Sequence, residues 1–121
     1  MELIIGGRCQ GKLAYALNLY GLTRDSVCTG RLEPKPVIYN LHIYIKEALS
    51  EGRDPEAEVL SFAESHPDTV FICDRLGCGL VPLKQEDREW RDKTGRICCL
   101  LAARAQRVHR VIAGIGQVIK G

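Results

Sequence analysis

The feature that most constrains this chain is a glycine loop that begins at its sixth residue. Residues 1–5 form a short apolar run of strand type, and the pattern becomes helical from Leu13 onward. Between them, Gly6, Gly11 and Lys12 have the spacing G-x-x-x-x-G-K. A strand, a glycine loop and a helix in this order are the context of a phosphate-binding loop. The sequence therefore predicts a phosphate site near the start of the chain.

The loop residues supply the chemistry that a phosphate needs. Glycines let backbone N–H groups turn inward, and the start of the following helix adds partial positive charge. Lys12 adds a full charge. The residues expected to bind the ligand are Gly6, Gly7, Arg8, Cys9, Gln10, Gly11, Lys12 and Leu13. Leu13 departs from the motif, because a Ser or Thr that holds magnesium usually stands there. The competing interpretation is an ordinary strand-to-helix turn with a solvated lysine.

Length and composition fit one globular domain over residues 1–121. The chain has 45% hydrophobic and 26% charged residues, and its formal charge of +2 is too small to indicate a nucleic-acid or membrane-surface partner. The N-terminal apolar run is too short for a targeting signal. No apolar stretch approaches the roughly 20 residues that a bilayer span requires. We therefore expect a cytoplasmic protein without a nucleic-acid partner.

The cysteines do not have the spacing of a zinc site. The six are Cys9, Cys28, Cys73, Cys78, Cys98 and Cys99. Paired C-x-x-C spacings are absent from the sequence, and a disulfide framework is not expected without a secretory signal. Most of these thiols are expected to be small buried hydrophobes.

Apolar runs alternate with helical patterns along the chain. Strands are expected at residues 1–5, 27–29, 37–39, 69–73, 108–113 and 117–120, and helices at 13–20, 41–52, 55–66 and 84–107. This alternation predicts an α/β fold of the P-loop NTPase type, a mainly parallel sheet flanked by helices with a C-terminal hairpin strand. Ligands of such sheets bind beyond the carboxyl ends of the strands. The loops after Ile5, Tyr39, Cys73 and Ala113 should therefore gather at one rim.

Two further residues at that rim are candidates for chemistry. Phosphoryl transfer needs a magnesium ion as well as positioned phosphates. Since Leu13 lacks a hydroxyl, the best remaining metal ligand is Asp74, which directly follows an apolar strand pattern. Asp74 is equally compatible with a loop or helix-capping role, so both interpretations stay open. For His42, at the start of a predicted helix, we favour a structural role over a base or a covalently modified residue.

Several blocks of the sequence form a recognisable set. The loop at residues 6–12 is similar to G-G-x-R-S-G-K-S, and residues 76–82 (L-G-C-G-L-V-P) are similar to V-G-x-G-I-V-P. Arg88, Arg91-Asp92 and Gly95-Arg96 match R-x-x-R-D-x-x-G-R, and the ends 113–115 and 118–120 match S/A-G-I and K-I/L-K. With these motifs the chain resembles the bifunctional adenosylcobinamide kinase / adenosylcobinamide-phosphate guanylyltransferase family of cobalamin biosynthesis.

The resemblance implies a function and site roles. A member of this family would bind GTP or ATP, transfer the γ-phosphoryl group to a hydroxyl of a cobinamide-like substrate, and self-associate into a homo-oligomer. By this resemblance Lys12 and the loop amides would hold the β- and γ-phosphates. Asp74 would hold magnesium or orient the acceptor.

The departures from the family pattern leave alternatives open. Family members are considerably longer, and the part missing here, between about Thr29 and Val37, contains the histidine that accepts GMP. No histidine of this chain matches that motif, so the resemblance does not carry guanylyltransfer over. Asn40 stands where the family has an acid, and Asp74-Arg75 replaces its N-E pair. A kinase, a non-catalytic nucleotide-binding regulator or assembly partner, and a fold without a ligand all remain compatible.

Overall fold

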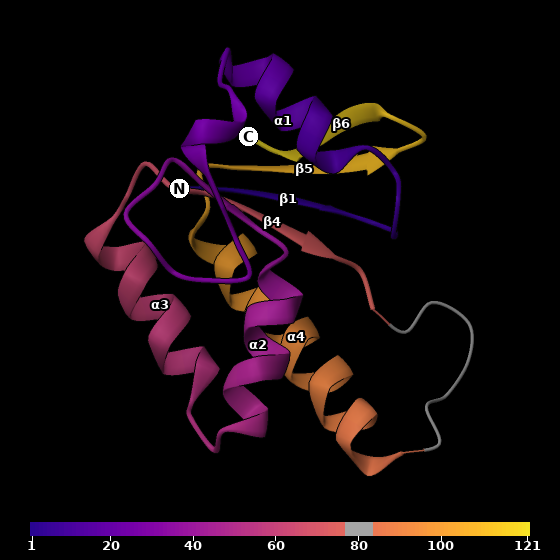
Figure 1. The fold of residues 1–121 in the computed structure, drawn as a ribbon. Coiled ribbons are helices and arrows are strands. Elements are labelled where there is room, and N and C mark those ends of the chain that lie inside the picture. Colours follow the sequence, from indigo (N-terminus) through magenta and orange to yellow (C-terminus); the bar gives the residue numbers. More distant parts are fainter. Residues whose placement is uncertain (77–83) are drawn as a thin grey trace.

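Six strands and four helices follow one another along the described chain, and helices separate most of the strands of the sheet (Figure 1). The computed structural model describes residues 1–76 and 84–121. The strands are β1 (Glu2–Gly6), β2 (Val27–Thr29), β3 (Val37–Tyr39), β4 (Val70–Asp74), β5 (Arg107–Ile112) and β6 (Ile115–Lys120). The helices are α1 (Lys12–Tyr20), α2 (Leu41–Ser50), α3 (Pro55–Ser65) and α4 (Gln85–Arg104), with a short 3-10 helix at Arg24–Ser26.

The strands of the described residues form one sheet in the order β2-β3-β4-β1-β5-β6. Neighbouring strands are parallel except β5 and β6, which form an antiparallel hairpin. Parallel pairing places the carboxyl ends of β1, β3 and β4 at the same edge of the sheet. The expected fold, mainly parallel with a C-terminal hairpin strand, is confirmed.

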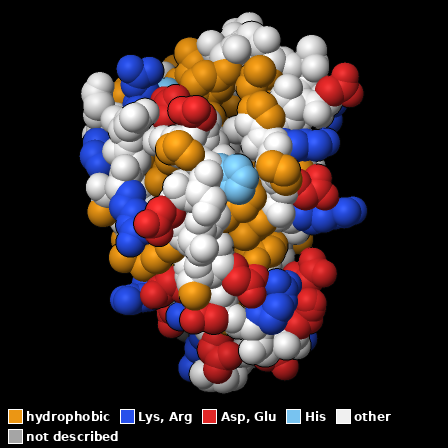
Figure 2. Space-filling view, turned by 90° about the vertical axis from the view of Figure 1, so that its left-hand side faces the viewer, with side chains coloured by type: hydrophobic (Ala, Val, Ile, Leu, Met, Phe, Trp, Pro, Cys, Tyr) orange, Lys and Arg blue, Asp and Glu red, His pale blue; other side chains and the backbone are white. Residues whose placement is uncertain are grey.

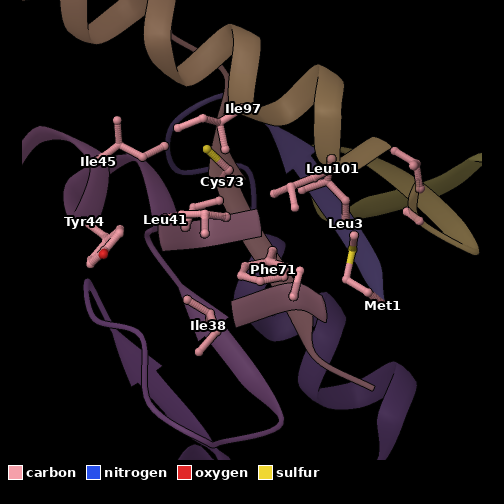
Figure 3. Close-up of a cluster of buried hydrophobic side chains, with 14 of the residues drawn as sticks. Met1, Leu3, Ile38, Leu41, Tyr44, Ile45, Phe71, Cys73, Ile97 and Leu101 are labelled. Carbon is pink, nitrogen blue, oxygen red and sulfur yellow. The ribbon is translucent and has the colours of Figure 1, made fainter. Parts of the chain in front are cut away.

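Helices cover both faces of the sheet. Figure 1 shows α1 on one face and α2, α3 and α4 on the other. The larger hydrophobic cluster lies under α2–α4, where Phe71 and Ile38 of the sheet meet Leu41, Ile97 and Leu101 of the helices (Figure 3). A smaller cluster, with Ile4, Ala16, Val37, Val70, Ile72 and Val111, lies on the α1 side. Central strand β4 is buried on both faces, as its continuous apolar pattern predicted.

Among the element boundaries that differ from the predictions are the end of α4 and the start of β6. Helix α4 ends at Arg104, because Arg107 pairs with Glu2 of β1 and the chain has to become extended before it. Strand β6 begins at Ile115 because the hairpin turn needs only two residues, Ala113 and Gly114. Both have positive φ, 51° and 77°, as a tight two-residue hairpin turn requires.

The expectation that most thiols are buried is wrong for the described cysteines. Cys28 and Cys73 are buried, Cys98 is half-buried, and Cys9 and Cys99 are exposed, all as free thiols. Cys78 lies outside the described residues. No helix within residues 1–76 and 84–121 has the length and apolar character that a membrane span needs. Figure 2 shows acidic and basic side chains next to one another on one face, in keeping with the net charge of +2.

Candidate functional site

The glycine loop leaves β1 and enters α1 in a conformation that requires its two motif glycines. A Cβ on Gly6 would lie 2.5 Å from the carbonyl oxygen of Val111. Gly11 caps α1 with a φ of 83°, in the left-handed region that glycine adopts without strain. Cys9 also has a positive φ, 58°. The spacing read from the sequence therefore reflects two separate backbone requirements, a close approach at Gly6 and a left-handed turn at Gly11.

Gln10 joins the loop to the β5–β6 hairpin. Its side-chain Oε1 accepts a hydrogen bond from the backbone N–H of Ala113 at 2.7 Å, and its carbonyl oxygen accepts one from Gly114 at 2.8 Å. Both N–H groups of the hairpin turn thus bind one loop residue. The sequence placed Gln10 in the loop but gave no signal for this partner, which lies more than a hundred positions further along the chain.

Lys12 and Asp74 form a buried ion pair at the end of the loop. Lys12 Nζ lies 2.7 Å from Asp74 Oδ1 and donates a hydrogen bond to the carbonyl oxygen of Gly7, also at 2.7 Å. Their side chains are only 4% and 16% exposed. The strand register brings them together, since Asp74 on β4 pairs with Gly6 on β1. Burying a charge is costly unless it is paired, and each of these two groups supplies the other's partner.

His42 lies on the other side of Asp74, at the rim where the sequence placed it. Its Nε2 is 3.3 Å from Asp74 Oδ2, and its Nδ1 accepts a hydrogen bond from the backbone N–H of Asp74 at 3.1 Å. Burial lowers the pKa of His42; the Asp74 carboxylate opposes this effect and the Lys12 ammonium reinforces it. The carbonyl oxygen of His42 accepts a hydrogen bond from Trp90 Nε1 at 2.7 Å, which connects α4 to the site.

These groups open onto a cavity of about 570 Å³. The residues that line it come from the loop and from the ends of β3 and β4, with parts of α2 and α4: Arg8, Cys9, Gln10, Gly11, Lys12, Leu13, Ala14, Tyr39, Asn40, His42, Ile43, Asp74, Arg75, Leu76 and Trp90. The volume lies in the range of small-molecule sites. Among the described lining residues Arg8, Lys12 and Arg75 are cationic and only Asp74 is anionic, which favours an anionic ligand.

Among the described residues, the cavity lining offers magnesium a single carboxylate, that of Asp74. Leu13 lines it without a hydroxyl, and Asn40 presents an amide. No group of three or more His, Cys, Asp or Glu residues that could hold a metal occurs within the described part of the chain. Magnesium is commonly held by one or two carboxylates, substrate phosphates and water. Asp74 therefore fits as one ligand of a magnesium ion that arrives with a phosphate compound.

Comparison with known proteins identifies the family. A family model described as cobinamide kinase / cobinamide phosphate guanyltransferase matches residues 38–119. The chain belongs to this family. It is also similar to the bifunctional adenosylcobalamin biosynthesis protein CobU of Salmonella typhimurium, with 35% identity over 75 residues. That match covers 60% of this chain but only 41% of the relative.

The matched region and the described structure overlap only in part. The cobinamide kinase family match begins at residue 38, so it contains His42, Asp74 and Trp90 but not the glycine loop. The prediction that this loop binds phosphate therefore rests on the spacing of its residues and on its geometry, and not on the family match. Of the glycine-bearing block at 76–82, Leu76 lines the cavity and residues 77–82 lie outside the described residues. On α4, Arg96 pairs with Glu56, and Arg91 pairs with Asp92, away from the cavity lining.

Proposed function

We propose that the chain binds GTP or ATP at its glycine loop and transfers the γ-phosphoryl group to the hydroxyl of a cobinamide-like acceptor. The observation that carries this proposal is the Lys12 ammonium, which is buried at the N-terminus of α1 and lines a cavity with more cationic than anionic side chains among its described residues. The family description, cobinamide kinase / cobinamide phosphate guanyltransferase, supplies the acceptor class and the reaction type. The relative's name places it in adenosylcobalamin biosynthesis.

The proposed roles follow from the positions of the charged groups. The loop amides and Lys12 would hold the β- and γ-phosphates, where they offset the charge that develops during transfer. Asp74 would hold magnesium together with phosphate oxygens, or orient the acceptor hydroxyl. When bound, magnesium would supply charge neutralisation at the phosphates. Guanylyltransfer is outside the proposal, because both ring nitrogens of His42, the histidine among the described cavity residues, face Asp74.

Calorimetric titration of GTP and ATP, with and without magnesium, tests the binding step. Lys12→Ala should weaken nucleotide affinity about 10-fold or more, because a hydrogen bond to a charged group contributes about 1.5–3 kcal/mol. Lys35→Ala is the matched control, since Lys35 precedes β3 at the opposite end of the sheet. If neither nucleotide binds the wild type, or if Lys12→Ala binds as tightly as the wild type, the proposal fails.

Turnover separates the kinase from its alternative, a non-catalytic nucleotide-binding regulator or assembly partner in the same pathway. Leu13 and Asn40 favour the regulator, because they remove groups that hold magnesium in related loops. Asp74 favours the kinase, since it places a carboxylate beside Lys12. Magnesium-dependent transfer of labelled γ-phosphate to cobinamide supports the kinase. Magnesium-independent binding without transfer supports the regulator.

We also propose that the chain self-associates through the β5–β6 hairpin. Ile112, Ile115, Val118 and Ile119 are exposed there, from 47% to 74%, and β6 is an edge strand of the described sheet. An apolar edge strand is a surface to which another strand can pair. Sedimentation should show an oligomer in the wild type and a shift toward monomer in Ile115→Lys. A wild type that stays monomeric at high concentration would contradict this assembly.

A further inference from the structure

Asn40 does not have the structural role that asparagine usually has at the start of a helix. It joins the end of β3 to the start of α2 with a φ of 56°, in the left-handed region. An asparagine side chain in this place commonly accepts a hydrogen bond from the first turn. Here the backbone carbonyl oxygen accepts from Ile43 and Tyr44, and the side chain makes no capping hydrogen bond. Within residues 1–76 and 84–121 the half-buried carboxamide has no hydrogen-bond partner.

The backbone at position 40 does not require a carboxamide. The left-handed conformation is open to asparagine and aspartate, and glycine adopts it without strain. Non-glycine residues held in this conformation are concentrated at functional sites. The other two in the described part of the chain are Cys9, which lines the cavity, and Ala113, whose N–H binds Gln10 of the loop. The carboxamide of Asn40, which also lines the cavity, is therefore a candidate contact for a ligand.

The order of the strands places Asn40 on the side of the cavity away from the phosphate loop. Strand β4 lies between β1, which leads into the loop, and β3, which leads into Asn40. The end of β3 is therefore about 5 Å from β4 and about 10 Å from β1. A γ-phosphate held by Lys12 would lie near the end of β4, because Lys12 is 2.7 Å from Asp74. In-line transfer then brings the acceptor oxygen from the β3 side, opposite the leaving oxygen.

The cavity lining on the β3 side suits the organic part of an alcohol. Tyr39, Ile43 and Trp90 present mainly apolar surface there. The Arg, Lys and Asp side chains of the described lining come from the loop and from the end of β4. Asn40 adds an amide, which accepts and donates hydrogen bonds without a charge, whereas a carboxylate would repel a phosphate close to it. A neutral amide in this place therefore fits a hydroxyl group that has to approach a phosphate.

We propose that Asn40 holds the acceptor hydroxyl for attack on the γ-phosphate, an inference that rests on the function proposed above. Its Oδ1 accepts the hydroxyl hydrogen, which directs a lone pair of the acceptor oxygen at the γ-phosphorus. The acceptor oxygen forms a bond to phosphorus, the bond to the β–γ bridging oxygen breaks, and its electron pair leaves on the nucleoside diphosphate. The hydroxyl proton passes to water, because a neutral amide does not retain it. Asp74 is then left to hold magnesium.

Asn40→Gly tests this role, because glycine keeps the left-handed backbone and removes only the side chain. Its melting temperature should stay close to that of the wild type, and its affinity for GTP or ATP should be unchanged. Its kcat/KM for cobinamide should fall about threefold or more, the contribution of one neutral hydrogen bond. Asn18→Ala is the matched control, since Asn18 is the other asparagine of the chain and is exposed on α1 outside the cavity lining. An unchanged kcat/KM in Asn40→Gly, or an equal loss of nucleotide affinity, would overturn the inference.

A binding measurement separates this contact from the reaction. With a non-hydrolysable nucleotide, the wild type should bind cobinamide about threefold or more tightly than an analogue in which hydrogen replaces the hydroxyl, and Asn40→Gly should bind both alike. Equal affinities in the wild type, a difference that persists in Asn40→Gly, or a difference that disappears in Tyr39→Phe instead would each contradict the contact. If the difference depends on Asn40 but the wild type transfers no phosphate, the proposed kinase function fails and the contact stands.

Discussion

Replacing Asp74 with asparagine should make the free protein less stable and magnesium-free nucleotide binding tighter. Lys12 and His42 both lie against the carboxylate, one at each oxygen. Asparagine keeps one acceptor oxygen but carries no charge, so the Lys12 ammonium loses its counter-ion. The ammonium then keeps the Gly7 carbonyl oxygen as a hydrogen-bond partner but has no opposite charge beside it, in a place where water hardly reaches it. The substitution therefore lowers the stability of the protein without nucleotide.

The size of the effect follows from the geometry of the pair. Two unit charges at the observed 2.7 Å attract by roughly 6 kcal/mol at an effective dielectric constant of about 20. Desolvation offsets much of this, and hydrogen bonds to charged groups contribute about 1.5–3 kcal/mol net. Because asparagine still accepts one hydrogen bond, we expect a loss near the lower limit. The melting temperature of the free protein should fall on the order of 5 °C.

The complex with nucleotide should not be destabilised by Asp74→Asn in the same way. A bound polyphosphate supplies new partners for Lys12, so the wild type has to break the Lys12–Asp74 pair on binding, while Asp74→Asn has less to break. A difference of about 1.4 kcal/mol corresponds to a tenfold gain in affinity. Asp74→Asn should therefore bind GTP or ATP roughly tenfold more tightly in the presence of a chelator, and nucleotide should raise its melting temperature more than that of the wild type.

Calorimetry and thermal unfolding in chelator, repeated with magnesium, measure these effects. Asp92→Asn is the control, because Asp92 is a carboxylate that is 71% exposed and pairs only with its neighbour Arg91 among the described contacts. With magnesium the gain should shrink, since Asp74 is then proposed to hold the metal. An affinity in chelator that is unchanged or weaker in Asp74→Asn would refute the idea that the nucleotide takes Lys12 from Asp74.

Three further changes test other parts of the site and fold. Leu13→Ser should increase the magnesium dependence of nucleotide affinity by restoring a hydroxyl ligand, and an unchanged calorimetric profile would count against the magnesium argument. Gln10→Ala should weaken nucleotide binding about 3- to 10-fold, because it leaves the Ala113 N–H without its acceptor at 2.7 Å; Gln106→Ala, exposed at the other end of the sheet, should bind normally. Burial, assisted by the Glu58 carboxylate, raises the pKa of Tyr44 to about 12. The stability that Tyr44 contributes is therefore complete below its unfolded pKa of about 10 and is lost as the pH rises toward the folded value. Urea unfolding should show the gap between wild type and Tyr44→Phe narrowing from about pH 9 to about pH 11, and a constant gap would contradict this assignment.

The sequence could predict those parts of the site that depend on local backbone geometry. Gly6 and Gly11 are recognisable because a close approach and a positive φ exclude other residues at these positions. Asp74 is recognisable because it follows a strand that is apolar throughout, and the carboxyl ends of parallel strands share one edge. The same alternation of strands and helices predicts the order of layers.

Contacts between distant segments could not be read from the sequence. His42 and Trp90 are 48 positions apart, and Gln10 and Ala113 are 103 apart, so no periodicity or spacing connects them. The helical pattern predicts too long an α4 for the same reason, since the pairing of β5 with β1 overrides this pattern after Arg104. A histidine at a helix start has many structural roles, and only its two contacts with Asp74 distinguish this one.

The contacts among the buried residues Lys12, Asp74 and His42 also determine whether magnesium would bind before the nucleotide or together with it. In the free protein Lys12 and His42 lie 2.7 and 3.3 Å from the two carboxylate oxygens of Asp74, and no other carboxylate lines the cavity among the described residues. A free magnesium ion would have to displace Lys12 or His42 while gaining only one protein carboxylate. A nucleotide removes Lys12 from Asp74 and adds phosphate oxygens at the same moment. We therefore expect magnesium to bind together with the nucleotide and not before it.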